Sequence, residues 1–339
     1  MKKWITRVAI TLLSVMALTT LNGTIYETIS RRNAATEFPA PGQLVDLGNG
    51  RHIQLDCRGQ GSPVVVFESG LDSLGSLSWA AVHDAVAQTT RACAYSRAGM
   101  MWSDASDRPF SSAYVAEDLH HALSAAGEPG PFVMVGHSLG GPYLMTYTGL
   151  YGEEVAGIVL VDASHPDQVA RIRAVIGKDI EQPTGLLNFA ASIAWTGLVR
   201  AVTRNEPTAP ASAPAAIQTP SAAWFLTSLS ALARETAGID ATMAIPEAAR
   251  NFGDRPLVVL THGEKTSPSN LQQMGLTEEQ GDHMDTVWRT LHNEQVTWST
   301  RSRHEVVPRS AHYIQFDKPQ AVITAVREVV EQVRQEAVP

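Results

Sequence analysis

The stretch VMVGHSLGG, residues 133–141, decides how this chain is expected to fold. An apolar run ends in GHSLG (136–140), and small residues suited to the start of a helix follow. A sharp turn from strand to helix strains the backbone of its central residue, and flanking glycines leave room for close chain approach. The pattern predicts that Ser138 is presented on such a turn. A purely structural turn is the alternative, because Gly-x-Ser-x-Gly alone is a weak signal.

Strand-like and helix-like segments alternate on both sides of this stretch. Continuous or alternating apolar runs predict strands, and apolar residues spaced three or four apart predict helices between them. This alternation is typical of an α/β fold, in which helices cover both faces of a parallel sheet and ligands bind at the carboxyl ends of the strands. The predicted strands are 51–57, 62–70, 91–96, 131–137, 155–162, 255–263 and 303–308, and the predicted helices are 77–88, 112 onward, 139–150, 283–292 and 317–336.

The length of 339 residues fits one core of about 250 residues with additional segments. We predict a core made of residues 40–164 and 251–339, interrupted by an insertion over 165–250. The insertion contains apolar helical patches around the segment NEPTAPASAPAAIQTP, whose proline and alanine content is typical of a mobile loop.

Residues 1–30 have the layout of an export signal. Met1–Arg7 is positively charged, and Val8–Leu21 is uncharged and mostly apolar. Because about 14 residues is short for a membrane-spanning helix, we expect an exported protein, either periplasmic or secreted. An uncleaved membrane anchor, with membrane association through this segment, is the alternative.

A serine hydroxyl attacks a substrate only when a neighbouring base accepts its proton. His312, in SAHYIQFDKP, is the candidate base, because it follows the last predicted strand at the same sheet edge as Ser138. His137 adjoins Ser138 but is expected to point elsewhere, and His262 is a weaker rival at a strand end.

Seven segments in this order resemble the α/β-hydrolase superfamily, in its esterase, lipase and peptidase-like branch. The resemblance covers about residues 42 to 335 and implies an eight-stranded, mostly parallel sheet with helices on both faces. It also implies a helical cap inserted after the sixth strand and a Ser-acid-His triad. The segments are VVVFESGLDS, the region of Trp79, YSRAGMMWSD, VGHSLGG, GIVLVDAS, PLVVLTHG and SAHYIQFDKP.

The resemblance implies two further features. An oxyanion hole is expected from the backbone N–H groups of Leu139, directly after Ser138, and of Leu71, in the loop after the third strand. Cys57 and Cys93 fall on the second and fourth strands, which are neighbours in that fold, so a disulfide is expected. Two unpaired thiols are the alternative.

The acid of the triad departs from the family pattern. The family's usual Asp position after the seventh strand holds Thr266, which cannot stabilise an imidazolium as a carboxylate does. Asp162, at the end of the sixth strand, and Glu264, in the seventh loop, are the two alternatives. We favour Asp162, because a short carboxylate at a strand end holds an imidazole more firmly than a long one on a loop.

These residues predict a serine hydrolase that cleaves a carboxylic ester through an acyl-enzyme. An amidase, an aminopeptidase or a carbon–carbon bond hydrolase on the same scaffold is the alternative within enzymes, and an inactive binding module is the alternative outside them. A small apolar ester is the expected substrate. The net charge of −8 without a basic patch excludes nucleic acid as an expected partner, and we expect no metal or other cofactor.

Overall fold

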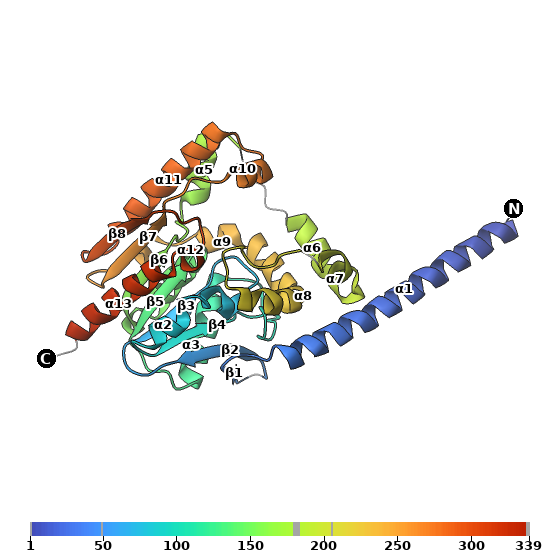
Figure 1. The fold of residues 1–339 in the computed structure, drawn as a ribbon, viewed down its shortest axis with the longest axis horizontal. Helices are drawn as coiled ribbons and strands as arrows, with labels where there is room; N and C mark the ends of the chain where they lie inside the picture. The colour runs from blue at the N-terminus through green and yellow to red at the C-terminus, as the bar shows by residue number, and fades with distance from the viewer. Residues whose placement is uncertain (1, 49, 179–183, 205, 337–339) are drawn as a thin grey trace.

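The structure, a computed structural model that describes residues 2–48, 50–178, 184–204 and 206–336, is built on one eight-stranded sheet (Figure 1). The strands are β1 (Gln43–Asp46), β2 (His52–Arg58), β3 (Val64–Glu68), β4 (Ala92–Tyr95), β5 (Phe132–His137), β6 (Val155–Val161), β7 (Leu257–His262) and β8 (Ser302–Val307). Their order is β1-β2-β4-β3-β5-β6-β7-β8; β2 pairs antiparallel with β1 and β4, and every other pair is parallel. The predicted α/β fold, with an eight-stranded and mostly parallel sheet, is confirmed.

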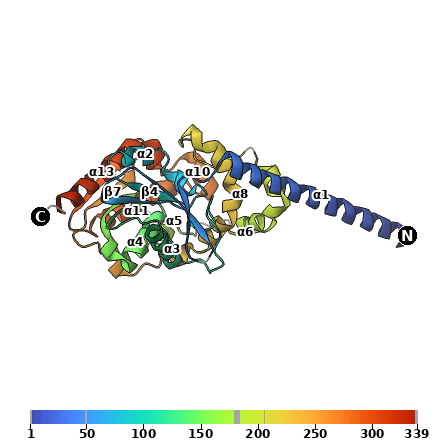
Figure 2. The ribbon, with the colours of Figure 1, turned by 90° about the horizontal axis from the view of Figure 1, so that it is seen from below.

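Helices cover both faces of this sheet. Figure 2 shows α2 and α13 on one side and α3, α4 and α11 on the other, and each side has its own buried apolar cluster. The helices of the sheet layers are α2 (His83–Ala87), α3 (Ser112–Ala125), α4 (Gly140–Leu150), α10 (Pro268–Met274), α11 (Glu278–Val296), α12 (Ile314–Asp317) and α13 (Pro319–Glu336), with the 3-10 turns η1 (Gly75–Trp79) and η2 (Gly152–Glu154).

The segment between β6 and β7 is helical and covers the carboxyl edge of the sheet. It corresponds to the stretch for which an insertion is expected, and we call it the cap. Its elements are α5 (Gln168–Ile176), α6 (Thr184–Ile193), η3 (Ala194–Thr196), α7 (Leu198–Thr203), α8 (Ala215–Ala237), α9 (Ile239–Met243) and η4 (Glu247–Arg250). The N-terminal helix α1 (Lys2–Glu37) extends away from the body (Figure 1).

The expected disulfide is present. Cys57 on β2 and Cys93 on β4 are register partners, and their sulfurs are bonded. These are the two cysteines of the sequence, so no thiol remains for other chemistry.

Two local predictions were wrong. The segment 77–88 is not one helix: it forms η1 and the short α2, because the Asp72 carboxylate accepts hydrogen bonds from Leu74 N and Ser78 Oγ and tightens the first turn. The predicted last helix, 317–336, starts later than expected: Asp317 ends α12, and α13 begins at Pro319. The Asp317 carboxylate accepts a hydrogen bond from Ala311 N at 2.7 Å and so supports the loop of His312.

Candidate active site

Ser138 lies on the expected turn between β5 and α4. Its φ of 51° is in the left-handed region that is strained for residues other than glycine. Both flanking positions need glycine because a side chain there would clash with its neighbours. A Cβ on Gly136 would lie 2.3 Å from Leu144 Cδ2, and a Cβ on Gly140 would lie 2.5 Å from the carbonyl oxygen of Glu68. Close packing against the end of β3 thus forces the chain to present the Ser138 side chain outward.

Three side chains from different loops meet at this edge of the sheet. The Ser138 hydroxyl lies 2.9 Å from His312 Nε2, and His312 Nδ1 lies 2.6 Å from Asp162 Oδ2. Because an ionised carboxylate only accepts hydrogen bonds, Nδ1 carries the proton and Nε2 is left to accept the proton of Ser138. The geometry therefore links a hydroxyl, a base and an acid in series.

Asp162 is fully buried and is held by a set of donors. Besides His312, its carboxylate accepts hydrogen bonds from His262 Nδ1 at 2.7 Å, His262 N at 3.0 Å and Trp288 Nε1 at 3.1 Å. Burial raises the pKa of Asp162, but the hydrogen bonds and charges of His262 and His312 outweigh it and hold the pKa well below its usual range. The carboxylate is therefore ionised at neutral pH.

The other two residues considered for the acid position lie elsewhere. The Glu264 side chain is exposed, and no hydrogen bond or ion pair joins its carboxylate to His312 in the described part of the chain. Thr266 donates from its backbone N and its hydroxyl to the carboxylate of Asp285, so it fastens its own loop to α11.

The sequence did not reveal the roles of two further histidines, His137 and His262. Burial, together with the nearby His312, lowers the pKa of His137 to about 3, so this ring is neutral and donates from Nε2 to the carbonyl oxygen of His312 at 3.0 Å. His262 was weighed only as a rival base, yet its ring contacts the acid. Its position at the end of β7, the strand beside the one that precedes Asp162, is the signal that could have revealed this contact.

The two residues expected to supply the oxyanion hole, Leu139 and Leu71, belong to one apolar cluster. Leu139 is the first residue after Ser138, and Leu71 follows β3 in a loop that approaches Ser138 closely: a Cβ on Gly70 would lie only 2.9 Å from Ser138 Cβ. In the described part of the chain, neither the Leu139 N–H nor the Leu71 N–H donates a hydrogen bond to another group. Both are therefore available to an oxygen bound there.

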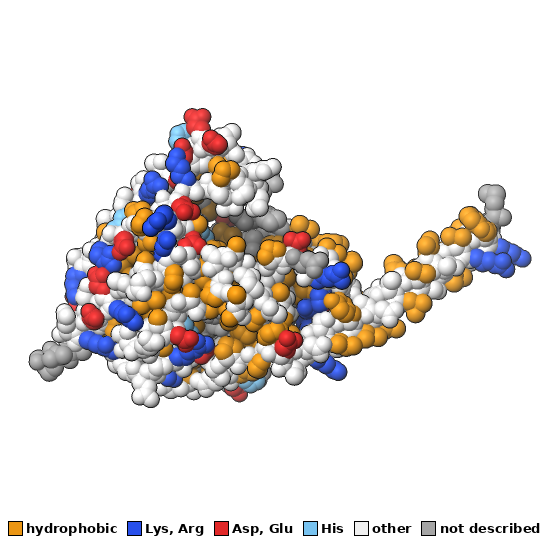
Figure 3. Space-filling view, viewed as in Figure 1, with side chains coloured by type: hydrophobic (Ala, Val, Ile, Leu, Met, Phe, Trp, Pro, Cys, Tyr) orange, Lys and Arg blue, Asp and Glu red, His pale blue; other side chains and the backbone are white. Residues whose placement is uncertain are grey.

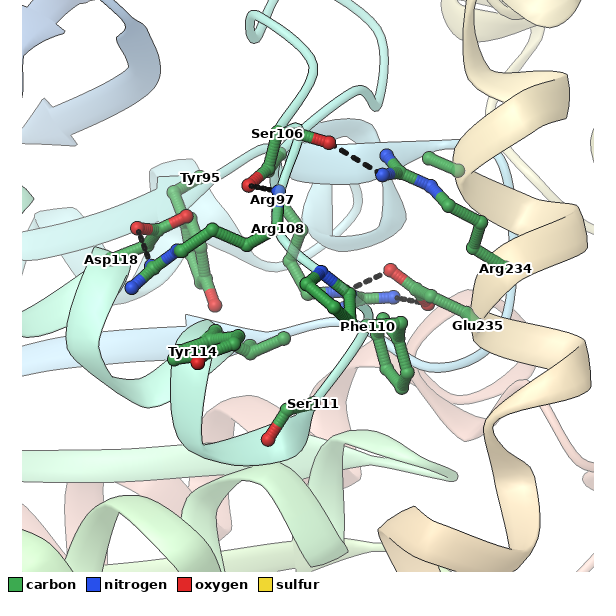
Figure 4. A pocket seen from close by; sticks show the side chains of 14 residues that line it. Tyr95, Arg97, Ser106, Arg108, Phe110, Ser111, Tyr114, Asp118, Arg234 and Glu235 are labelled. Carbon is green, nitrogen blue, oxygen red and sulfur yellow. Dashed lines mark hydrogen bonds and ion pairs between the residues drawn. The ribbon is translucent and has the colours of Figure 1, made fainter. Parts of the chain in front are cut away.

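A buried arginine holds the loop of Leu71 from behind. Arg97 donates to the carbonyl oxygens of Ser69 at 2.8 Å and Gly70 at 2.7 Å, and it forms ion pairs with Glu68 at 2.8 Å and Glu235 at 2.7 Å. Figure 4 shows Glu235 reaching Arg97 from the cap helix α8. The loop after β3 and the cap are thus fastened to one guanidinium.

The Arg97 guanidinium is shared by two buried carboxylates, those of Glu68 and Glu235. Burial raises the pKa of Glu68 to about 7, against the opposing effects of Arg97 and of the hydrogen bond from the Tyr95 hydroxyl. A carboxyl whose pKa is higher in the folded protein contributes stability that is complete below its unfolded pKa, near 4.5, and is lost as the pH rises through about 7.

Glu68→Gln is therefore expected to remove a pH dependence. The wild type should lose on the order of 3 kcal/mol of unfolding free energy between about pH 5 and about pH 8 relative to the variant. Parallel denaturant titrations of both proteins measure this difference. Burial raises the pKa of Asp72 to about 6, but both proteins contain Asp72, so its contribution to the pH dependence cancels in the comparison. If the difference in unfolding free energy between the wild type and Glu68→Gln stays the same from about pH 5 to about pH 8, Glu68 does not titrate in this range.

A pocket of about 670 Å³ opens beside Ser138 and His312. Its apolar wall includes Val169, Ile172 and Ile239 from the cap helices α5 and α9. Two tryptophans of the cap do not line this pocket: Trp195 is 55% exposed, and the Trp224 indole donates to Phe38 O.

Two groups of side chains in the described residues lie close enough to share a metal ion. The first includes Cys57 and Cys93, whose sulfurs are bonded to each other and so are not available as thiolates. The second is Asp162, His262 and His312, but both ring nitrogens that reach the carboxylate donate hydrogen bonds to it. A metal in this second group would displace the hydrogen bond that orients His312.

Comparisons with known proteins agree with this fold. Residues 63–179 match the family model described as alpha/beta hydrolase fold. An esterase from Thermogutta terrifontis superposes with a TM-score of 0.54 at 17% identity, covering 86% of this chain and 97% of its own. An epoxide hydrolase superposes with a TM-score of 0.57 at 15% identity, covering 86% and 98%. These comparisons show that the chain has the α/β-hydrolase fold.

Among curated sequences, the chain is 25% identical over 320 residues to "Probable transporter efuK" from Hormonema carpetanum. The match covers 85% of this chain and 42% of that protein. The chain spans between 14% and 50% of the length of the curated relatives that it matches.

Proposed function

We propose that this protein is a serine hydrolase that cleaves a carboxylic ester through an acyl-enzyme intermediate. The observation that carries the proposal is the series of contacts from the Ser138 hydroxyl through His312 to the buried, ionised Asp162. Epoxide hydrolases of this fold use a carboxylate nucleophile, whereas the turn here carries a serine.

In the proposed mechanism, His312 Nε2 accepts the proton of Ser138 as Oγ attacks the ester carbonyl carbon. The N–H groups of Leu139 and Leu71 donate to the oxyanion of the tetrahedral intermediate. The alcohol leaves with the proton from His312. A water then attacks the acyl carbon as it gives a proton to the same nitrogen, and the carboxylic acid is released when the bond to Ser138 Oγ breaks and His312 returns that proton to the serine. Asp162 keeps His312 in one tautomer and stabilises its protonated form.

The apolar wall of the pocket supports an ester with an apolar acyl or alcohol group. The N-terminal apolar helix and the disulfide fit export or membrane anchoring. Because the positive charges Lys3 and Arg7 precede the apolar run, we propose that the N-terminus stays in the cytoplasm and the body lies outside.

The test is a set of chromogenic esters of increasing acyl length, combined with a fluorophosphonate probe. We expect turnover and a probe adduct on the peptide that contains Ser138. No turnover of any ester and no adduct would instead indicate an inactive binding module, and turnover without an adduct would indicate a different nucleophile.

His262 supplies a smaller, graded prediction. His262→Leu removes a hydrogen bond to a buried carboxylate and should lower kcat by about tenfold to a hundredfold, with KM nearly unchanged. His262→Asn, which keeps a donor, should recover part of that loss. Steady-state kinetics of the two variants measure the effect, and equal rates in all three proteins would contradict a positioning role for His262.

A further inference from the structure

The cap carries an exposed apolar surface. Outside α1, nine large apolar side chains are exposed in the described residues, and five of them lie within 186–202. We call these five the cap face; they are Leu186 (70% exposed), Phe189 (61%), Trp195 (55%), Leu198 (57%) and Val202 (71%), on α6, η3 and α7. A cluster of this kind is costly in water and marks an interaction surface.

Helix α1 carries an uncharged stretch that is longer than the 14-residue run Val8–Leu21 and that reaches membrane-spanning length next to this surface. Its residues from Val8 to Tyr26 carry no charge, between Arg7 and Glu27, and they span about 28 Å as a helix. The hydrocarbon core of a bilayer is about 30 Å thick. The most apolar window of α1 has a mean hydropathy of 1.7 and is not buried against the body. Figure 3 shows its apolar side chains along the extended helix, with cations at the far end.

The cap contacts α1 where this uncharged run ends. Gly23 packs so closely on η3 that a Cβ there would lie 2.0 Å from the carbonyl oxygen of Thr196. One helical turn further, Glu27 and Arg200 form an ion pair at 2.7 Å in which both side chains are largely buried. The cap face therefore belongs to the part of the cap that contacts α1 at the level at which the helix leaves its uncharged stretch.

The pocket of Ser138 reaches the same part of the cap. Thr184, the first residue of α6, lines that pocket, whereas Leu186 and Phe189 on the same helix are exposed. One helix thus borders both the site and the cap face.

We propose that the cap face rests on the lipid bilayer that α1 enters, so that the pocket opens at the membrane surface and takes an ester from an amphiphilic molecule held in the bilayer. The substrate class rests on the proposed function, whereas the membrane contact does not. Trp195, at this level, has the position in which tryptophan is enriched at membrane interfaces.

A single introduced cysteine tests the contact directly, because both native cysteines are in the disulfide. The full chain carrying Leu198→Cys is labelled with an environment-sensitive fluorophore and reconstituted in vesicles of phosphatidylcholine and phosphatidylglycerol. The matched control is Val306→Cys, an exposed apolar position on β8, far from the cap in Figure 1. We expect a blue-shifted emission that brominated lipids quench at position 198, and an aqueous emission at position 306.

Two results would overturn the contact. One is an aqueous emission at position 198 in chains whose helix α1 is inserted. Quenching of Trp4 by brominated lipids shows that α1 is inserted. The other is a blue shift that depends on the protein-to-lipid ratio and resists brominated lipids, because a second copy of the chain would then cover the cap face.

The substrate class is tested with Leu198→Glu/Val202→Glu and the control Val306→Glu. We expect the double variant to hydrolyse a long-chain ester embedded in vesicles at least tenfold more slowly than the wild type, with unchanged turnover of a water-soluble short-chain ester. Equal rates on the embedded ester would overturn the membrane substrate. If neither ester is hydrolysed by the wild type, the proposed function fails while the fluorescence result stands.

Discussion

Ser138→Ala is expected to lower kcat for a chromogenic ester by about a million-fold, because the group that forms the covalent intermediate is lost. The remaining rate should reflect only binding and the backbone donors of Leu139 and Leu71. Initial rates over a range of ester concentrations measure the loss, and the fluorophosphonate adduct should disappear with it.

Ser164→Ala is the matched control for this experiment. Ser164 also lines the pocket, and its backbone N–H donates to the carbonyl oxygen of Ser138, but in the described part of the chain no hydrogen bond joins its hydroxyl to His312. It should therefore retain turnover within a few-fold of the wild type. If Ser138→Ala hydrolysed esters at the wild-type rate, the nucleophile assigned here would be wrong.

Asp162→Asn is expected to lower kcat by about ten-thousand-fold. Asparagine keeps the size of the side chain, but its amide would favour the tautomer of His312 that cannot accept the proton of Ser138. Since hydrogen bonds hold the pKa of Asp162 far below neutrality, the wild-type acid is ionised throughout the neutral range, and no choice of pH in that range should rescue the variant.

Glu264→Gln tests the other acid considered from the sequence. Its side chain is exposed and not joined to His312, so kcat should change by less than about twofold, as for an ordinary surface charge. Stopped assays of both variants against the same ester decide between them. A large loss in Glu264→Gln with a normal rate in Asp162→Asn would reverse the assignment.

Removal of metal ions offers a further check on the group formed by Asp162, His262 and His312. Because the hydrogen bond from His312 Nδ1 to Asp162 occupies the position that a metal would need, a chelator should leave ester turnover unchanged. Activity that disappears with a chelator and returns with a divalent cation would contradict the triad chemistry.

Much of the fold was predictable because its signals are local. Strand residues such as those of β3 and β5 are continuous apolar runs buried on both faces, and helix spacing repeats over three or four residues. The segment 77–88 misled this reasoning, because hydrogen bonds to Asp72, outside the periodic stretch, decided its form. The role of Asp317 was missed for a related reason: its partner, Ala311, precedes it in an irregular loop.

The sequence by itself determined the strand-turn-helix at Ser138, since the small residues Gly136 and Gly140 and the apolar run before them suffice to specify it. It also placed His312 at the same sheet edge. Only the tertiary structure decided which carboxylate meets His312, because Asp162 and His312 are joined across 150 positions of the chain. The same is true of Arg97 with Glu235 and of Glu27 with Arg200, which are 138 and 173 positions apart. Such contacts depend on how layers pack, and a charged residue gives no periodic signal of its distant partner.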